Sequence, residues 1–195
     1  MTASKFPRIV AGIDEAGRGS WAGPVVAAAV ILPRGFDSSA LRDSKLLTPR
    51  ARERLFERIT SVCPFAVGVV GNATIDRIGI KQATHRAMLS ALRKLPIRPA
   101  KLMIDGNDGF RFALPTESII RGDQLIPAIS AASIVAKVWR DRLMLRLHSR
   151  YGAYGFDRHK GYGTALHLAS LQYNGPCSIH RMSFRPLADG IQVRE

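Results

Sequence analysis

The chain has 195 residues, and 46% of them are apolar, so it can bury a proper core and need not be disordered. It has 29 Lys and Arg against 15 Asp and Glu, and the formal net charge of +14 favours a polyanionic partner. Nucleic acid is a better candidate for that partner than an anionic membrane, because no basic amphipathic helix with an aromatic face is evident.

The chain shows no sign of export, of a disulfide framework or of a zinc knuckle. Its two cysteines, Cys63 and Cys177, are far apart and lack CxxC spacing, which suits a reducing compartment. Charge and proline interrupt residues 1–7 before any apolar stretch reaches signal-peptide length. The longest apolar run, residues 22–32, contains a glycine and a proline and is too short to cross a bilayer. We therefore expect a cytoplasmic protein that does not enter a membrane.

The first part of the chain predicts two strands and a helix. Residues 8–13 alternate loosely and lead into a glycine turn at residues 14–19, as a strand followed by a turn does. Residues 25–32 are a continuous apolar run rich in β-branched side chains, which is typical of a deeply buried strand. Thr48 and Pro49 are a favourable N-cap and first residue for the helix that follows.

The rest of the chain predicts strands mixed with helices. Further short strands are expected at residues 65–70, 101–104 and 117–120. Further helices are expected at residues 81–95, at about 127–150 and after Thr164, followed by an irregular tail from Pro176. This order favours an α/β protein in which helices cover both faces of a mixed sheet.

Four acids follow or interrupt predicted strands in a chain where acids are scarce: Asp14, Glu15, Asp105 and Asp123. A charge in such a place is costly unless something compensates it. A cluster of carboxylates without Cys or suitably spaced His selects hard cations such as Mg²⁺ or Mn²⁺. Two such ions would hold the attacking water and the leaving oxygen of a phosphodiester displacement.

Each of these acids, taken alone, is equally well explained as a turn cap or as the partner of an arginine. That alternative is weaker for all four together. Asp14 and Glu15 are also neighbours, and neighbours in a regular strand point to opposite faces. They can share a site only if the strand twists or breaks, for which Gly17 provides the opportunity.

An ordered series of short motifs extends from about residue 9 to residue 186. The motifs are 12–19 (GIDEAGRG), 22–25 (AGPV), 43–46 (DSKL), 104–106 (IDG), 122–123 (GD), 131–138 (AASIVAKV), 140–141 (RD), 154–156 (YGF), 159–164 (HKGYGT) and 180–184 (HRMSF). In this order they resemble the bacterial type 2 ribonuclease H family (ribonuclease HII). Ser20-Trp21 and Arg121 depart from the residues usual in that family, which bears on substrate fine-tuning rather than on chemistry.

The resemblance implies a ribonuclease H-like fold, with a mixed five-stranded sheet flanked by helices and a helical C-terminal appendage. It implies one catalytic domain, residues 1–195, of which about 151–195 form a substrate-contacting appendage. The implied activity is endonucleolytic hydrolysis of the RNA strand of RNA–DNA hybrids, and incision 5′ to single ribonucleotides embedded in duplex DNA. Two Mn²⁺ or Mg²⁺ ions would serve this reaction, and the products would carry 3′-hydroxyl and 5′-phosphate ends. The implied biological role is the removal of ribonucleotides during DNA replication and repair. A monomer is the default.

The resemblance also assigns roles to individual residues. It makes the four acids the catalytic metal ligands, and it implies that Gly17, Arg18 and Gly19 read the ribonucleotide. Without the resemblance, we would interpret this glycine segment as an ordinary turn between two strands. Tyr162 would pack where ribose meets deoxyribose, although a tyrosine there can also simply anchor its loop. The implied phosphate and other substrate contacts are Lys45, Ser133, Lys137 and Lys160.

Other polar residues have less definite roles. We expect some late basic residues to contact phosphates and others to be solvated surface: Arg140, Arg142, Arg146, Arg150, Arg158, Lys160, Arg181 and Arg185. His85 and His148 are expected on helix surfaces, whereas His159 and His180 are candidates for phosphate contact or for ordering a loop. Trp21 is expected to pack against the core rather than to stack on nucleic acid.

Three alternatives to this assignment remain open. A protein that binds RNA–DNA without cutting it would share the basic charge but have no use for an acidic cluster. A resolvase or integrase would keep fold and metals and change the substrate. The sister type 3 ribonuclease H is disfavoured, because no further substrate-binding domain is apparent before Ile9.

Overall fold

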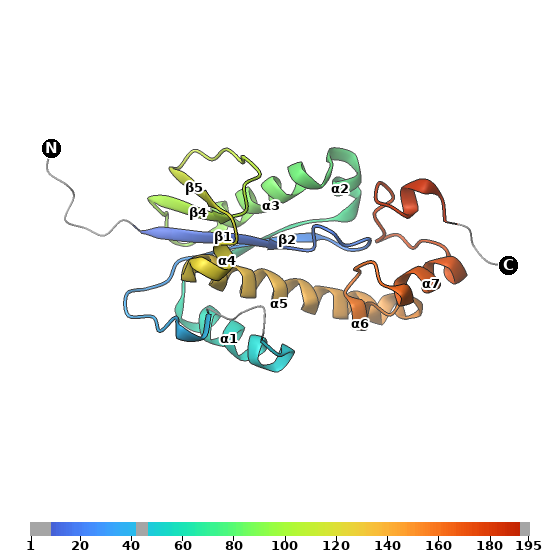
Figure 1. Ribbon diagram of the computed structural model, residues 1–195, viewed down its shortest axis with the longest axis horizontal. Coiled ribbons are helices and arrows are strands. Elements are labelled where there is room, and N and C mark those ends of the chain that lie inside the picture. Colours follow the sequence, from blue (N-terminus) through green and yellow to red (C-terminus); the bar gives the residue numbers. More distant parts are fainter. Residues whose placement is uncertain (1–8, 42–46, 192–195) are drawn as a thin grey trace, which may run out of the picture.

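The computed structural model describes residues 9–41 and 47–191 (Figure 1). A five-stranded sheet with the order β3-β2-β1-β4-β5 forms its centre. The strands are β1 (Val10–Ala16), β2 (Val25–Val30), β3 (Phe65–Val70), β4 (Lys101–Asp105) and β5 (Thr116–Ile119). β1 is antiparallel to β2 and parallel to β4, so the sheet is mixed, as the sequence predicts.

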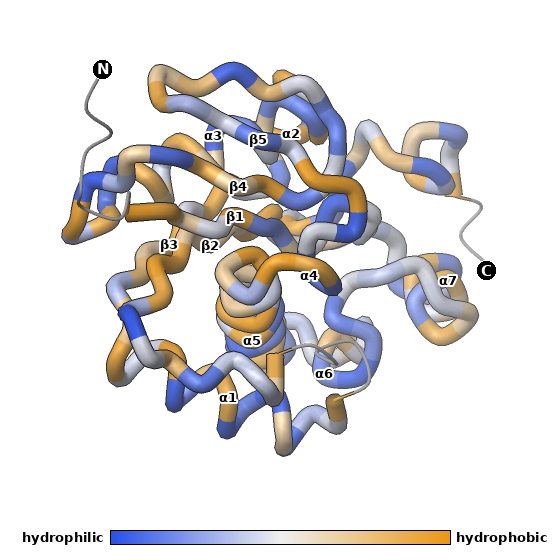
Figure 2. Tube along the Cα trace, turned by 60° about the vertical axis from the view of Figure 1, so that its left-hand side comes forward, coloured by the Kyte–Doolittle hydropathy of each residue, from blue (hydrophilic) through white to orange (hydrophobic). Residues whose placement is uncertain are grey.

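Helices cover both faces of this sheet (Figure 1). The α-helices are α1 (Pro49–Val62), α2 (Asn72–Ile78), α3 (Ile80–Lys94), α4 (Gly122–Leu125), α5 (Pro127–Arg150), α6 (Phe156–His159) and α7 (Ala165–Asn174). One core cluster fills the space between the sheet and α3, and a second fills the space between the sheet, α1 and α5. Figure 2 shows α5 beneath the sheet, with apolar strand segments above it. Because β2 is buried along its whole length, its continuous apolar sequence is explained.

Two glycines allow helices to approach the sheet closely. A Cβ on Gly12 of β1 would lie 2.1 Å from the backbone of Ala128 in α5. A Cβ on Gly68 of β3 would lie 1.9 Å from the carbonyl oxygen of Ala87 in α3. At these two positions the backbone of the sheet lies so close to a helix that no side chain would fit between them.

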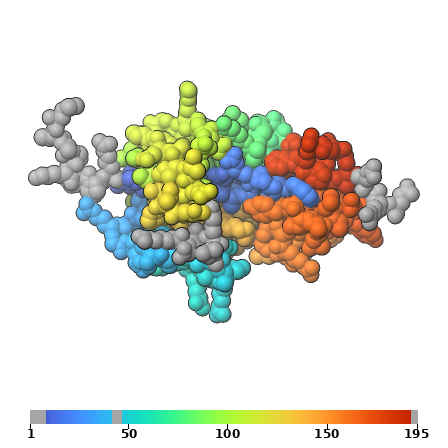
Figure 3. All heavy atoms as spheres, viewed as in Figure 1, coloured from blue at the N-terminus to red at the C-terminus, as the bar shows by residue number. Residues whose placement is uncertain are grey.

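The C-terminal segment forms a small helical appendage, and a third core cluster joins it to Met144 of α5 and to Ala22 in the segment between β1 and β2. Bridges between Ser20 and Tyr162 and between Ala22 and His180 attach it to the segment that joins β1 to β2. In Figure 3 the C-terminal segment, orange and red, lies on either side of this blue segment. The chain thus returns to the end of β1 after more than a hundred and forty residues.

The predicted elements agree closely with those observed, with two kinds of exception. β1 continues through Asp14 and Glu15 to Ala16, whereas the sequence analysis ended this strand before the acids. The short helices α2 and α4 were not predicted. Among the described residues, no helix is long and apolar enough to cross a membrane.

Candidate active site

Asp14 lies on β1, which packs against the central helix α5. It is only 6% exposed, and its Oδ1 accepts the backbone N–H of Glu15 at 2.7 Å. Burial raises the pKa of Asp14 well above its usual value, and the charges of Glu15 and Asp105 raise it further. A hydrogen bond with the hydroxyl of Ser133 on α5 opposes these effects. Asp14 is thus a carboxylate that is held in the protein at an electrostatic cost.

Glu15 is the next residue along β1 and lies beside Arg18. Burial raises its pKa, whereas the positive charge of Arg18 and a hydrogen bond from it lower that pKa. β1 runs unbroken through both acids, so of the two ways in which they were expected to share a site, a break or a twist of the strand, the break is excluded. Both nevertheless interact electrostatically with Asp105, so the two side chains belong to one acidic region.

Asp105 and Asp123 come from the two segments next to β1. β4 is parallel to β1, and Ile104 pairs with Ile13. Asp105, the last residue of β4, therefore lies beside the part of β1 that carries the two acids. The backbone N–H of Asp123, in the first turn of α4, is 3.5 Å from Asp105 Oδ1. Gly122 makes this approach possible, because a Cβ there would lie 2.6 Å from the Ile129 side chain.

The structure therefore places all four predicted acids around the ends of β1 and β4. Their ligand atoms are carboxylate oxygens, which suit hard divalent cations. Among the described residues, no group of three or more Asp, Glu, His or Cys side chains is arranged so that it could hold a metal ion. Asp108 is a fifth acid that the sequence analysis missed. Arg18 donates to both of its carboxylate oxygens, at 2.5 and 3.1 Å, and to Glu15 at 3.2 Å.

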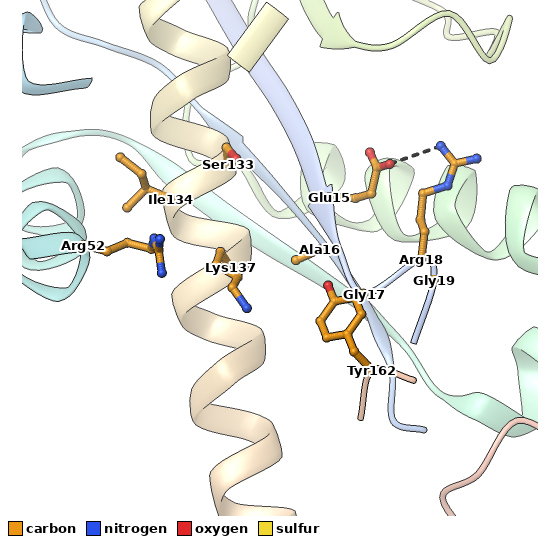
Figure 4. Close-up of a pocket in the computed structure, with 10 residues that line it drawn as sticks. All are labelled: Glu15, Ala16, Gly17, Arg18, Gly19, Arg52, Ser133, Ile134, Lys137 and Tyr162. Carbon is orange, nitrogen blue, oxygen red and sulfur yellow. Dashed lines mark hydrogen bonds and ion pairs between the residues drawn. The ribbon is translucent and has the colours of Figure 1, made fainter. Parts of the chain in front are cut away.

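A cavity of about 400 Å³ adjoins this acidic region (Figure 4). Its walls are formed by Glu15, Ala16, Gly17, Arg18, Gly19, Arg52, Ser133, Ile134, Lys137 and Tyr162. The structure thus brings together the glycine turn, the two predicted α5 residues and Tyr162. Lys45 lies outside the described residues. Lys160 does not line the cavity, and its ammonium group instead donates to the carbonyl of Asp157.

Two basic groups of the cavity come from helices, in addition to Arg18 of the glycine turn. Lys137 of α5 donates to Asp141 at 2.8 Å, and its Nζ lies 5.6 Å from the centre of the Tyr162 ring. Arg52 of α1 also lines the cavity and donates to the carbonyl of Leu47 at 3.0 Å. The sequence analysis missed Arg52, because an arginine in the first turns of a helix has no local feature that separates it from solvated surface.

Two of the late arginines are not phosphate contacts. Arg140 and Arg181 are completely buried, and their guanidinium groups donate to backbone carbonyls. The expectation that they contribute to a phosphate-binding surface was wrong for these two residues. Arginine is favoured at both kinds of site, and its position in the sequence does not distinguish them.

Three histidines of the appendage are also buried, namely His159, His167 and His180. His159 accepts the backbone N–H of Gly161 at 3.1 Å, and His167 and His180 are joined through their Nε2 atoms at 3.0 Å. Of the two expected roles of His159 and His180, ordering a loop is confirmed and phosphate contact is excluded by burial. Trp21 packs on His167 with ring centroids 5.3 Å apart, as the packing expectation predicts.

Solved structures share this architecture. The crystal structure of ribonuclease H2 from Pyrococcus horikoshii OT3 is 28% identical, has a TM-score of 0.80, and covers 94% of this chain and 96% of its own. The crystal structure of Bst-RNase HIII in complex with Mn²⁺ is 19% identical, has a TM-score of 0.70, and covers 93% of this chain and 68% of its own. The mixed sheet and the acids at the ends of its central strands thus define a nuclease of ribonuclease H-like fold.

Sequence comparison specifies the class further. Residues 11–186 match the family described as Ribonuclease HII. A Ribonuclease HII of Nitratidesulfovibrio vulgaris is 53% identical, over 92% of this chain and 87% of that relative. The chain belongs to the ribonuclease HII family. Membership makes the protein a hydrolase of the nuclease class and supports endoribonuclease activity on RNA–DNA hybrids.

Proposed function

We propose that the protein incises duplex DNA on the 5′ side of single embedded ribonucleotides, and that it also cuts the RNA strand of RNA–DNA hybrids. One observation carries the proposal. The cavity that Glu15 lines is also walled by the turn Gly17–Arg18–Gly19 and by Tyr162, so a candidate ribose reader adjoins a carboxylate cluster. Such an arrangement has a use in a nuclease that selects for ribose, and none in a protein that only holds phosphates.

Asp14, Glu15, Asp105 and Asp123 would hold a pair of divalent ions, Mn²⁺ or Mg²⁺, because carboxylate oxygens are the ligands that these cations prefer. Burial raises the pKa of Asp14 most, and the like charges of Glu15 and Asp105, which a cation would neutralise, raise it further. When bound, two such ions supply activation of a water molecule and stabilisation of the leaving 3′-oxygen. The Mn²⁺ complex of Bst-RNase HIII supports this choice of metals. The products would carry 3′-hydroxyl and 5′-phosphate ends.

The chain's own residues bind and orient the strand. Backbone groups of the glycine turn would bond to the 2′-hydroxyl, since they can approach a sugar closely. Tyr162 would pack against the sugar at the junction of ribose with deoxyribose. Ser133 and Lys137 are four residues apart on α5 and would contact one phosphate backbone. We add Arg52 to these phosphate contacts, because it lines the same cavity.

The remaining features of the proposal concern the whole protein. The chain would act as one catalytic domain, with the appendage from about residue 151 contacting substrate and Lys45 and Lys160 contributing to binding. It would act as a monomer in the cytoplasm, where ribonucleotides must be removed from DNA during replication and repair. The high positive charge supports the nucleic-acid partner.

The first experiment uses an end-labelled DNA duplex with one internal ribonucleotide, together with Mg²⁺ or Mn²⁺. We expect a single cut 5′ to the ribonucleotide and none in an all-DNA duplex. Asp14→Asn should abolish cutting, because it removes a metal ligand, and should leave duplex binding intact. Asp37→Asn is the matched control, since Asp37 is an exposed carboxylate that pairs with Arg58. Binding without cutting in either metal would disprove the nuclease assignment and leave a binding protein.

A further inference from the structure

Two buried guanidinium groups lie behind the glycine turn, one from α5 and one from the C-terminal appendage. Both Arg140 and Arg181 are 0% exposed. Among the described residues, no carboxylate forms a hydrogen bond or ion pair with either group. Burial lowers the pKa of both side chains, and the charge of Arg140 further lowers that of Arg181. Buried charges of this kind are weak contributors to stability, so another role must be considered.

The hydrogen bonds of Arg181 indicate what that role is. Its Nη2 donates to the carbonyl of Gly17 at 2.7 Å and its Nη1 to the carbonyl of Arg18 at 2.9 Å. Its Nε donates to the carbonyl of Gly23 at 3.0 Å. The planar guanidinium fork thus holds two successive carbonyls of the turn on the interior side.

This arrangement determines where the amide groups of the turn point. In a trans peptide the carbonyl of one residue and the N–H of the next point in opposite directions. The peptide bonds of the turn are trans. With the carbonyls of Gly17 and Arg18 directed inward, the N–H groups of Arg18 and Gly19 are directed outward, on the side of the cavity that these residues line.

The outward side of the turn is open. A Cβ on Gly19 would meet no atom within 4 Å. The inward side is packed, because a Cβ on Gly17 would lie 2.0 Å from Nε of Arg140. Neither the N–H of Arg18 nor that of Gly19 donates to another residue in the part of the chain that the structure describes. The turn therefore presents two donors to the cavity and is fixed from behind.

We propose that Arg181 is a positioning residue for ribose recognition, which orients the amides of Arg18 and Gly19 by holding the carbonyls of Gly17 and Arg18. The inference rests on the proposed function, because it assumes that the turn reads ribose. The appendage then has a second role besides contact with substrate. Its Arg181 positions the glycine turn from the interior side of the protein. Arg140 differs in its partners, since its three bonds end on Ala22, Pro24 and Lys160, outside the turn.

Arg181→Lys is the test variant, because it keeps the charge and loses the fork. The readout is the ratio of the dissociation constants of an all-DNA duplex and a single-ribonucleotide duplex, measured without divalent metal. Losing one well-formed hydrogen bond to the ribose predicts a fall in this ratio of about tenfold. Affinity for the all-DNA duplex should stay within about twofold, because no phosphate contact is removed. The cutting rate with Mg²⁺ should fall in parallel with the ratio.

Arg140→Lys is a comparison for stability only. It removes an equally buried fork that makes no hydrogen bond to the turn, but Arg140 packs behind Gly17 and over the ring of Tyr162. It should lose stability to a degree comparable with Arg181→Lys. Arg185→Lys is the matched control for the ratio, because it changes an exposed arginine. It should change neither the stability nor the ratio. If Arg181→Lys folds poorly, Phe184→Leu loosens Arg181 more gently, because the guanidinium lies 5.0 Å above the Phe184 ring. It should shift the ratio in the same direction by less.

Backbone NMR of the metal-free protein tests the same contact without any substrate. Arg181→Lys should shift the amide signals of Arg18 and Gly19 and leave that of Gly68, in β3, unchanged. Unchanged amides in Arg181→Lys, or a ratio equal to that of the wild-type protein, would overturn the inference. If the wild-type protein itself shows no preference for the ribonucleotide, the proposed function fails, and the NMR result alone decides whether Arg181 holds the turn.

Discussion

At the scale of single residues, Asp14 shows that stability and catalysis make opposite demands. Its carboxylate lies between a sheet and a helix, among other acids, where burial and like charges raise its pKa. A protein selected only for stability would have a neutral side chain here. The proposed metal ions explain why a charge is kept in such a place.

Replacing Asp14 by Asn should therefore stabilise the metal-free protein. The folded pKa of Asp14 is above the unfolded one, so the ionised carboxylate lowers the free energy of unfolding at neutral pH. We expect Asp14→Asn to raise that free energy at pH 7 in chelator. The gain should shrink as the pH falls, because Asp14 then becomes protonated. Urea unfolding at pH 7 and pH 5 measures both effects, and a destabilised variant at pH 7 would contradict this account.

The four acids of the site could be predicted from the sequence because each stands next to glycine or another acid at a strand end. The cavity residues Gly17, Ser133, Lys137 and Tyr162 came from the family resemblance alone. Asp108 and Arg52 were missed and Arg181 was given the wrong role, since the contacts that matter are made across 90 residues or more, or depend on the packing of two helices. No local pattern contains that information.

At the scale of secondary structure, long apolar patterns predicted their elements almost to the residue. β3 and α5 have the predicted bounds, because burial on the sheet and on one helix determines both. α2 is short and is anchored by tertiary contacts, as when the Asn72 side chain donates to the carbonyls of Ser178 and His180 at 3.0 Å. β1 extends through its two acids because each pairs with a residue of β2. Neither pairing nor anchoring is visible in a local window of sequence.

The close contact between β3 and α3 predicts which glycine can be replaced. Gly68→Ala would drive a methyl group to within 1.9 Å of the Ala87 carbonyl oxygen, so the helix must move. We expect a loss of more than about 2 kcal/mol in the free energy of unfolding. Gly71→Ala is the control, since a Cβ there meets no atom within 4 Å and φ is −75°. Thermal and urea unfolding of both variants should differ clearly, and equal stabilities would refute the packing argument.

At the scale of the whole molecule, the appendage is held together by neutral histidines. The Nδ1 of His167 faces the carbonyl of Tyr162, so it must donate, and Nε2 of His167 then accepts from Nε2 of His180. The Nδ1 of His180 in turn accepts the backbone N–H of Cys177 at 2.9 Å. This sequence of donors and acceptors is complete only while both rings are uncharged.

Mild acid should therefore loosen the appendage. Burial lowers the pKa of His167 and of His180 to about 4, below the unfolded value near 6.5. The unfolded chain then binds more protons, so stability is complete above pH 6.5 and is lost as the pH falls towards 4. Each histidine contributes a slope of up to about 1.4 kcal/mol per pH unit. Unfolding from pH 7 to pH 4.5 should show this slope, with NMR titration of both rings as the check. Rings that titrate near pH 6.5 would contradict the prediction.

The attachment of the appendage to the end of β1 also has a consequence for how the protein is made. Arg181 and Gly17 are 164 positions apart, so Gly17 leaves the ribosome long before the two residues can meet. At about 5–20 residues per second, the acids emerge on the order of ten seconds before the residue that orients the turn. A product that terminates early, after α5, would carry all four acids together with a turn that lacks its hydrogen bonds from Arg181. On the proposal above, selectivity for ribose is therefore completed only after the appendage has been translated and has folded onto the turn.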